Sequence, residues 1–367
     1  MNASTPLPPR SRSAQTRRTP APRKTKKPKR RRWATVLLSF FAVVILGLGA
    51  YAGYLYWEFN QFLNDISGGG DDKPIASADS AQVRPVSMVL LGLDTRSGTG
   101  TLNTDVLMVA AFNPKSNTAT VVSIPRDSLL ELDGYKKQKV NAYYSGFYRE
   151  GRSEEGLNED QAYAYAREGM RKMFGEFFGV KFDYTAIINF QGFIDVVDAL
   201  GGVKVYVDQD MRYVDNADKT NIDLKKGEQV LDGKQALDFV RYRKSNRGTA
   251  DSSDFARNER QARVLAAIAD KLKSLGGVTR LGNVISAVGN NMTTDIPKQQ
   301  ITHMLKAYYD LDSEHIRFIP LEGKWKSPYV YLDDSSVQKA REALAEELSP
   351  EGRTVGGDEA ASASDAG

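Results

Sequence analysis

Cysteine is absent from the 367 residues, and histidine occurs only twice, at His303 and His315. The chain therefore has no disulfide, no thiolate nucleophile and no zinc or iron–sulfur site that uses cysteine. Two histidines also exclude a three-histidine zinc site. An enzyme of this composition has to work through carboxylates, Arg, Lys, hydroxyl groups or an oxygen-bound metal.

Acidic residues are missing from residues 1–33, which contain twelve Lys and Arg side chains. The remainder holds 38 basic and 46 acidic residues, a net charge of −8, although the whole chain carries +4. A domain that binds nucleic acid would keep its positive charge on the folded part, so we expect no nucleic-acid partner. Because residues 1–33 are Pro-rich, basic and nearly free of apolar residues, they are predicted to be disordered.

Charge is absent again between Trp33 and Trp57, where the residues are almost all apolar. At about 1.5 Å per residue, a helix over 34–57 spans the roughly 30 Å core of a bilayer. The aromatic ends and the preceding basic tail predict a single-pass signal-anchor whose N-terminus is cytoplasmic. Two alternatives are a buried core helix and a cleaved signal peptide, but the run is long for either.

Gly, Ser and Asp enrichment predicts a linker over 58–85, and similar composition predicts a disordered tail over 348–367. Residues 86–347 show no comparable break and are interpreted as one extracytoplasmic domain. Short apolar runs at 86–92, 106–112, 118–124, 184–189 and 203–207 alternate with helical patterns. This alternation predicts an α/β fold, with a mixed central β-sheet covered by helices on both faces.

Polar residues follow or precede these predicted strands where each strand ends. Asp94 and Arg96 follow the first run, Asp105 precedes the second, and Arg126 and Asp127 follow the third. Ligands bind at such strand ends in α/β sheets, and two carboxylates there suit Mg²⁺ together with substrate phosphates. The alternative for each Asp is that it caps a turn or pairs with an Arg.

A second group of polar residues lies later in the chain, at Arg241, Arg243, Arg257 and Arg260. Arg241 and Arg243 share a face if their segment is extended, and Arg257 and Arg260 share a face of a helix that begins near Asp254. Four guanidinium groups near a helix N-terminus favour a phosphate clamp. The alternative is a solvated basic face. No Gly-rich nucleotide loop is present, so the pattern indicates a pyrophosphate other than ATP.

Seven sets of residues together resemble the LytR-CpsA-Psr family of bacterial cell-wall ligases. They occur in the family's order over about residues 86–275: Gly92-Leu-Asp94-Thr-Arg96; Thr104-Asp105; Ser123-Ile-Pro-Arg-Asp127; Lys139-Val-Asn-Ala142; Ile188-Asn-Phe190 with Asp198-Ala-Leu-Gly-Gly-Val203; Gly233-Lys-Gln-Ala-Leu237 with Val240-Arg-Tyr-Arg243; and Asp254-Phe-Ala-Arg257 with Arg260-Gln261. One departure is Asn103, where many members carry Arg.

The resemblance implies transfer of a glycopolymer from a polyprenyl-pyrophosphate carrier to peptidoglycan at the outer face of the membrane, with membrane lipid as a further partner. It implies Mg²⁺ (or Mn²⁺) held by Asp94 and Asp105, one of which activates the acceptor hydroxyl. The catalytic residues would be Asp94, Asp105 and Arg126. The implied pyrophosphate ligands are Arg96, Arg126, Arg241, Arg243, Arg257 and Arg260, with Asp127, Asp254 and Gln261 in support.

Two other functions compete with this one. A polyprenyl-pyrophosphate phosphatase would use the same site with water as the acceptor. A non-catalytic wall-binding or regulatory membrane protein would not need the site, so substitutions of Asp105 and Arg126 would leave its cellular role intact.

Overall fold

The computed structural model of the protein describes residues 53, 54, 56, 57, 60, 61, 74–93, 102–216, 220–274, 284, 288 and 291–354. The predicted tail over 1–33 and nearly all of the predicted membrane span over 34–57 lie outside these residues. Within the described ranges, no helix is long and apolar enough to cross a membrane. The membrane anchor therefore stays a prediction.

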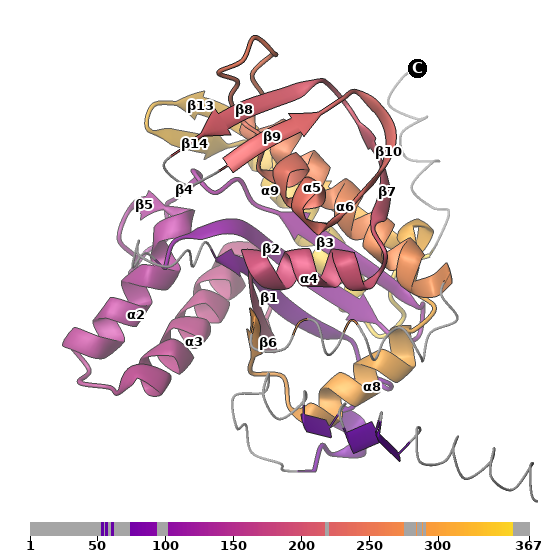
Figure 1. Ribbon diagram of the computed structural model, residues 1–367. Helices are drawn as coiled ribbons and strands as arrows, with labels where there is room; N and C mark the ends of the chain where they lie inside the picture. Colours follow the sequence, from indigo (N-terminus) through magenta and orange to yellow (C-terminus); the bar gives the residue numbers. More distant parts are fainter. Residues whose placement is uncertain are drawn as a thin grey trace, which may run out of the picture. The chain divides into compact units, whose positions relative to one another are not determined.

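Six strands form the central sheet in the order β11-β6-β1-β2-β3-β12 (Figure 1). The sheet is mixed, because β6 is parallel to β1 and β12 is parallel to β3, whereas the other neighbours are antiparallel. Its strands are β1 (Val86–Leu93), β2 (Thr104–Asn113), β3 (Thr118–Ser123), β6 (Tyr184–Asn189), β11 (Met292–Thr294) and β12 (Ile316–Pro320). The predicted strands at the centre of the sheet are confirmed.

Helices cover both faces of this sheet, as predicted from the alternating pattern. One face packs Val89, Leu107 and Val122 against α2 (Tyr143–Ser153), α3 (Glu159–Phe178) and α9 (Asp334–Glu347). The opposite face packs Met88 and Met108 against α6 (Asp254–Ser274) and α8 (Lys298–Tyr308). The central strands are apolar at nearly every position because both of their faces are buried.

A second apolar core lies beside the sheet and includes α4 (Phe190–Ala199) and α5 (Gly233–Arg241). It also contains residues of β7 (Val203–Val207), which pairs with β10 (Gly227–Leu231), and of β8 (Met211–Asp215), which pairs with β9 (Thr220–Leu224). Capping boxes open α3 at Asn158 and α5 at Asp232, as their spacing to Gln161 and Gln235 predicts. The remaining short elements are η1 (Ser77–Asp79), β4 (Leu129–Leu130), β5 (Gln138–Lys139), η2 (Val140–Ala142), η4 (Ser313–His315), β13 (Gly323–Lys326) and β14 (Tyr329–Leu332).

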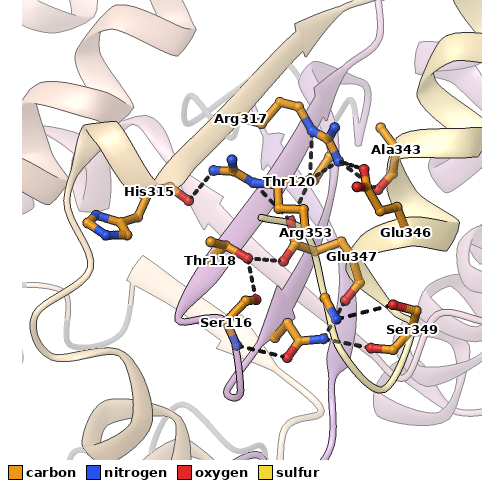
Figure 2. A network of polar contacts seen from close by, with 12 residues as sticks. Ser116, Thr118, Thr120, His315, Arg317, Ala343, Glu346, Glu347, Ser349 and Arg353 are labelled. Atoms are coloured by element: carbon orange, nitrogen blue, oxygen red, sulfur yellow. Dashed lines mark hydrogen bonds and ion pairs between the residues drawn. The ribbon is translucent and has the colours of Figure 1, made fainter. Parts of the chain in front are cut away.

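Packing extends beyond the predicted domain limits of 86 and 347. Before β1, Ala81 is buried and its N–H donates to the side chain of Gln300. After α9, Arg353 is buried beside the carboxylate of Glu347, and its guanidinium donates to the carbonyl of His315 (Figure 2). Thr118 and Thr120 of β3 donate to the same Glu347 carboxylate. Composition placed residues 349–353 in the tail because it does not reveal these long-range polar contacts.

Candidate functional site

A pocket of about 590 Å³ opens at the end of the central sheet where β1 and β6 finish and β2 begins. This is the place where α/β sheets bind ligands. Most of the residues that line the pocket are apolar, and they come from the central sheet, α4, α5, α6 and β9. The apolar lining residues are Leu90, Leu91, Val106, Met108, Ala186, Ile187, Ile188, Phe190, Phe193, Ile222, Leu237, Val240, Leu265 and Met292.

Five cationic side chains also line this pocket, namely Arg126, Arg241, Arg243, Lys244 and Arg257. One described carboxylate, that of Asp105, lines it with them. The pocket therefore combines a largely apolar lining with a strongly positive group of side chains. This combination suits an amphiphilic ligand that has an anionic head and an apolar body.

Asp105 and Arg126 come from the neighbouring strand ends that the sequence pattern brought together. The guanidinium of Arg126 donates to Asp105 Oδ1 at 2.5 Å, and both side chains are about a quarter exposed. Arg126 follows β3, and its backbone carbonyl accepts a hydrogen bond from the N–H of Asn141. The pair confirms the alternative that Asp105 binds an Arg, and it also places both groups in the pocket wall.

Asp127 does not line the pocket but contacts a residue that does. Its carboxylate is buried, accepts a hydrogen bond from Lys139 Nζ at 2.9 Å and lies 3.8 Å from an Nη atom of Arg243. Asp127 therefore ties the segment after β3 to the segment after α5. The supporting role of Asp127 stays a prediction, and the structure adds Lys139, to which we assigned no role from the sequence, as a residue in contact with it.

The structure corrects the expected backbone of the Arg241–Arg243 segment. Arg241 is the last residue of α5, and the helix ends at Tyr242, whose ψ of 124° is not helical. The guanidinium of Arg241 lies 4.6 Å from the centre of the Phe190 ring, a cation–π contact that holds it at the pocket. Arg241 and Arg243 both reach the pocket without the strand alternation that we expected.

Arg257 and Arg260 also differ from expectation, because only one of them lines the pocket. Arg257 and Gln261 lie in the pocket wall, and both are nearly buried. Arg260 is only 1% exposed, and two of its nitrogens donate to the Asp208 carboxylate at 2.8 and 2.6 Å. A third nitrogen donates to the carbonyl of Tyr242 and to Ser252 Oγ. Arg260 thus joins three segments of the chain, through Asp208, Tyr242 and Ser252, and it is not among the residues that line the pocket.

The structure does not describe the side chains of three other predicted site residues, Asp94, Arg96 and Asp254. Asp94 and Arg96 lie outside the described residues, although Leu93, which precedes Asp94, pairs with Thr104, which precedes Asp105. Asp254 is the first residue of α6, and only its backbone is described. Asn103, at the position where the family often has Arg, is exposed, and its side chain accepts a hydrogen bond from Ser145.

The described residues of the pocket could bind a divalent metal ion only if the substrate supplied further oxygen ligands. No group of three or more His, Asp and Glu side chains that could hold a metal occurs in the part of the chain that the structure describes. Mg²⁺ binds proteins through one or two carboxylates and completes its shell with waters and substrate phosphates. Asp105 supplies one such carboxylate at the pocket, beside cations that suit the same phosphates.

Comparison with known proteins decides the family. The LytR_cpsA_psr family matches residues 55–353, which is most of the chain. The chain belongs to the LytR-CpsA-Psr family. The resemblance found in the motifs is therefore confirmed, and the family match begins before the predicted start of the domain.

The match between this chain and its named relatives covers nearly the whole length of each relative. The polyisoprenyl-teichoic acid–peptidoglycan teichoic acid transferase TagU of Bacillus mycoides is 32% identical over 323 residues, which cover 85% of this chain and 96% of TagU. TagT of Bacillus subtilis, which has the same activity name, is 28% identical over 342 residues, which cover 89% of this chain and 98% of TagT. A solved structure of TagT bound to LI-WTA has a TM-score of 0.56 and 27% identity, and covers 76% of this chain and 96% of that one.

Proposed function

We propose that this protein transfers a glycopolymer from a polyprenyl-pyrophosphate carrier to peptidoglycan. The observation that carries the proposal is the pocket, whose apolar wall and cationic side chains match the two chemical parts of such a carrier. The names of the TagU and TagT relatives, which describe transfer of teichoic acid to peptidoglycan, support the same function. The mixed α/β fold that this chain shares with TagT places the pocket at a sheet end.

The charged groups in the pocket have a defined task in this reaction. Arg241, Arg243 and Arg257 hold the pyrophosphate oxygens, because a guanidinium donates two parallel hydrogen bonds to phosphate. Arg126 stabilises the negative charge that develops as the carrier monophosphate departs. Arg241, Arg243 and Arg126 are held by Phe190, Asp127 and Asp105, respectively, so that little reorganisation of these three is needed when the substrate binds.

The bond changes follow from the chemistry of a sugar–pyrophosphate–prenyl substrate. The acceptor hydroxyl oxygen attacks the phosphorus atom next to the sugar, and the bond from that phosphorus to the bridging oxygen breaks. The glycopolymer becomes attached through a phosphodiester, and polyprenyl monophosphate leaves with the bridging oxygen. A carboxylate, Asp105 or Asp94, accepts the proton of the hydroxyl.

A bound Mg²⁺ or Mn²⁺ would neutralise charge on the pyrophosphate, with Asp105 and Asp94 as its protein ligands. The four arginines that line the pocket also neutralise negative charge on the pyrophosphate. We therefore propose that the metal ion and these arginines together balance the charge of the pyrophosphate.

We also propose that the predicted membrane anchor over 34–57 keeps the domain outside the cytoplasm and near the membrane. The carrier's prenyl chain is itself a membrane lipid, so an anchored enzyme meets it in the same layer. No ATP is available outside the cytoplasm, and cleavage of the pyrophosphate supplies the free energy of the transfer.

The test uses the full-length protein in lipid nanodiscs with a synthetic polyprenyl-pyrophosphate-linked sugar, Mg²⁺ and peptidoglycan fragments. Mass spectrometry should detect a ligated product that disappears in Asp105→Ala. Sugar phosphate and polyprenyl phosphate without ligated product would identify the competing phosphatase. Full complementation of a deletion strain by Asp105→Ala and Arg126→Ala would identify the non-catalytic alternative.

A further inference from the structure

A short antiparallel hairpin near the pocket exposes aromatic and basic side chains. Strand β13 pairs with β14 so that Lys324 lies opposite Tyr331 and Trp325 lies opposite Val330. Because side chains alternate along a strand, Lys324 and Tyr331 share one face, and Trp325 and Val330 share the other. Val330 is buried, whereas Trp325 is 48% exposed and Tyr331 is 42% exposed.

Backbone contacts join this hairpin to the segment that carries the site arginine. The N–H of Val330 donates to the carbonyl of Asp127 at 2.9 Å, and Ser128 forms a parallel bridge with Val330. Asp127 directly follows Arg126, whose guanidinium lines the pocket. The hairpin therefore has a fixed position beside the catalytic residues, and Figure 1 shows it near β4 and β5.

Side-chain contacts continue this connection from the hairpin to the pocket. Lys139 Nζ lies 5.8 Å from the centre of the Trp325 ring and 2.9 Å from Asp127 Oδ1. The other oxygen of Asp127 lies 3.8 Å from Arg243, which lines the pocket. Trp325 is thus separated from a proposed pyrophosphate ligand by two intervening side chains, and about half of Trp325 is still accessible to a ligand.

We propose that the β13–β14 hairpin binds the glycan strand of the peptidoglycan acceptor and presents its sugar hydroxyl to the pocket. This inference rests on the proposed function. The pyranose rings of a glycan have C–H faces with slight positive charge, which pack on the negative face of an aromatic ring. Trp325, on the face that contacts Lys139, offers such a ring beside the site at which the donor reacts, whereas Tyr331 lies on the opposite face of the hairpin.

Charge on the hairpin favours the same ligand. Lys324 and Lys326 are both exposed. Lys326 Nζ lies 5.6 Å from the Tyr331 ring centre, so these two side chains share the face of the hairpin opposite Trp325, where the long lysine side chains can still reach carboxylates at the edge of a bound strand. Peptidoglycan strands carry carboxylates on their stem peptides, and these complement the two ammonium groups.

Contact with the bilayer is the other use of exposed Trp and Lys side chains. The hairpin geometry favours the glycan, because the turn consists of Ser327 and Pro328 and so offers no large apolar side chain for insertion. The Trp325 ring contacts Lys139 of β5, and through it Asp127, instead of extending from the turn.

Fluorescence can test this proposal independently of turnover. The chain has three tryptophans, so that Trp33→Phe with Trp57→Phe leaves Trp325 as the only one. In proteoliposomes, soluble uncrosslinked peptidoglycan strands should shift the Trp325 emission, and lipids brominated on their acyl chains should not quench it. Quenching by brominated lipid, or an emission that peptidoglycan leaves unchanged, would overturn the proposal.

Kinetics provide the second readout. In Trp325→Ala, the KM for the peptidoglycan acceptor should rise about three- to tenfold, as loss of an aromatic stacking contact implies. The KM for the lipid-linked donor should not change. The control is Tyr309→Ala, which removes a 70%-exposed ring just after α8. If Trp325→Ala is active and its KM for the acceptor is unchanged, the hairpin assignment is refuted and the proposed function is not. If the wild-type protein forms no product, the proposed function is refuted. The fluorescence measurement then still tests whether the hairpin binds peptidoglycan.

Discussion

Replacing Arg260 by Ala separates a structural arginine from the pocket arginines that share its sequence motif. Arg260 is 1% exposed, and its guanidinium donates to Asp208, to the carbonyl of Tyr242 and to Ser252. The substitution removes all of these bonds and leaves the Asp208 carboxylate without its main partner. We therefore expect a loss of stability that exceeds the effect of removing any exposed arginine.

The magnitude follows from the burial of the two partners. Removing one member of a buried ion pair costs about 3–5 kcal/mol. Asp208 is 28% exposed and can regain water, so we expect about 2–4 kcal/mol for Arg260→Ala. In a domain of this size, each kcal/mol of lost stability lowers Tm by about 2–4 °C. The expected decrease in Tm is therefore about 5–15 °C.

Differential scanning calorimetry of the full-length protein, with turnover measured on the same samples, checks this expectation. The matched control is Arg263→Ala, one turn along α6, where a 42%-exposed guanidinium lies 3.7 Å from Asp208. That change should cost no more than about 1 kcal/mol. If Arg260→Ala kept the wild-type Tm and still lost turnover, the structural role would be wrong and Arg260 would return to the pyrophosphate ligands.

Four further outcomes are expected. Arg126→Ala should reduce turnover about 100- to 1000-fold while the free energy of unfolding changes by less than about 1 kcal/mol, because the Arg126–Asp105 ion pair is partly exposed; an equal loss of Tm and activity would contradict this. Burial alone would raise the pKa of Asp312, but hydrogen bonds from His315 and Lys273 outweigh it and lower the pKa to about 2. Asp312→Asn should therefore cost about 1 kcal/mol at pH 7, and urea unfolding should show that this difference disappears as the pH falls from about 4 to about 2. EDTA should abolish turnover, and Mg²⁺ or Mn²⁺ should restore it; full activity in EDTA would remove the metal from the proposal. Protease added outside intact spheroplasts should degrade the domain, and protection would overturn the predicted topology.

Local sequence signals were sufficient for much of the fold. Asn158 and Asp232 each have a Gln three residues later, and this spacing is enough to define the start of a helix. The strand over 184–189 has the predicted limits, because its apolar run is bounded by polar residues on both sides. Features of this kind depend on residues that are neighbours in the chain.

Features that depend on distant partners were not predictable. The helical spacing of Arg257 and Arg260 places both near one face, but only Asp208, 52 residues before Arg260, determines that Arg260 turns away from the pocket. The predicted extended segment over Arg241–Arg243 begins one residue too early, because α5 continues through Arg241 and ends at Tyr242.

The hairpin formed by β13 and β14 was also missed, although a signal exists in the sequence. Lys324-Trp-Lys326 and Tyr329-Val-Tyr331 alternate in polarity on either side of Ser-Pro, which is typical of paired strands around a turn. The four-residue length of each strand makes this pattern weak when it is read without the structure.

The order of strands in the central sheet has a consequence for biogenesis. Both outer strands, β11 and β12, come from residues 292–320, whereas the four inner strands are complete by residue 189. While the chain is synthesised, β6 and β3 therefore present open edges for the time needed to make about a hundred further residues. Open strand edges pair readily with other chains, and late long-range pairing prolongs this exposure. Copies of the protein that have not yet paired β11 and β12 are therefore expected to aggregate more readily than copies in which the sheet is closed.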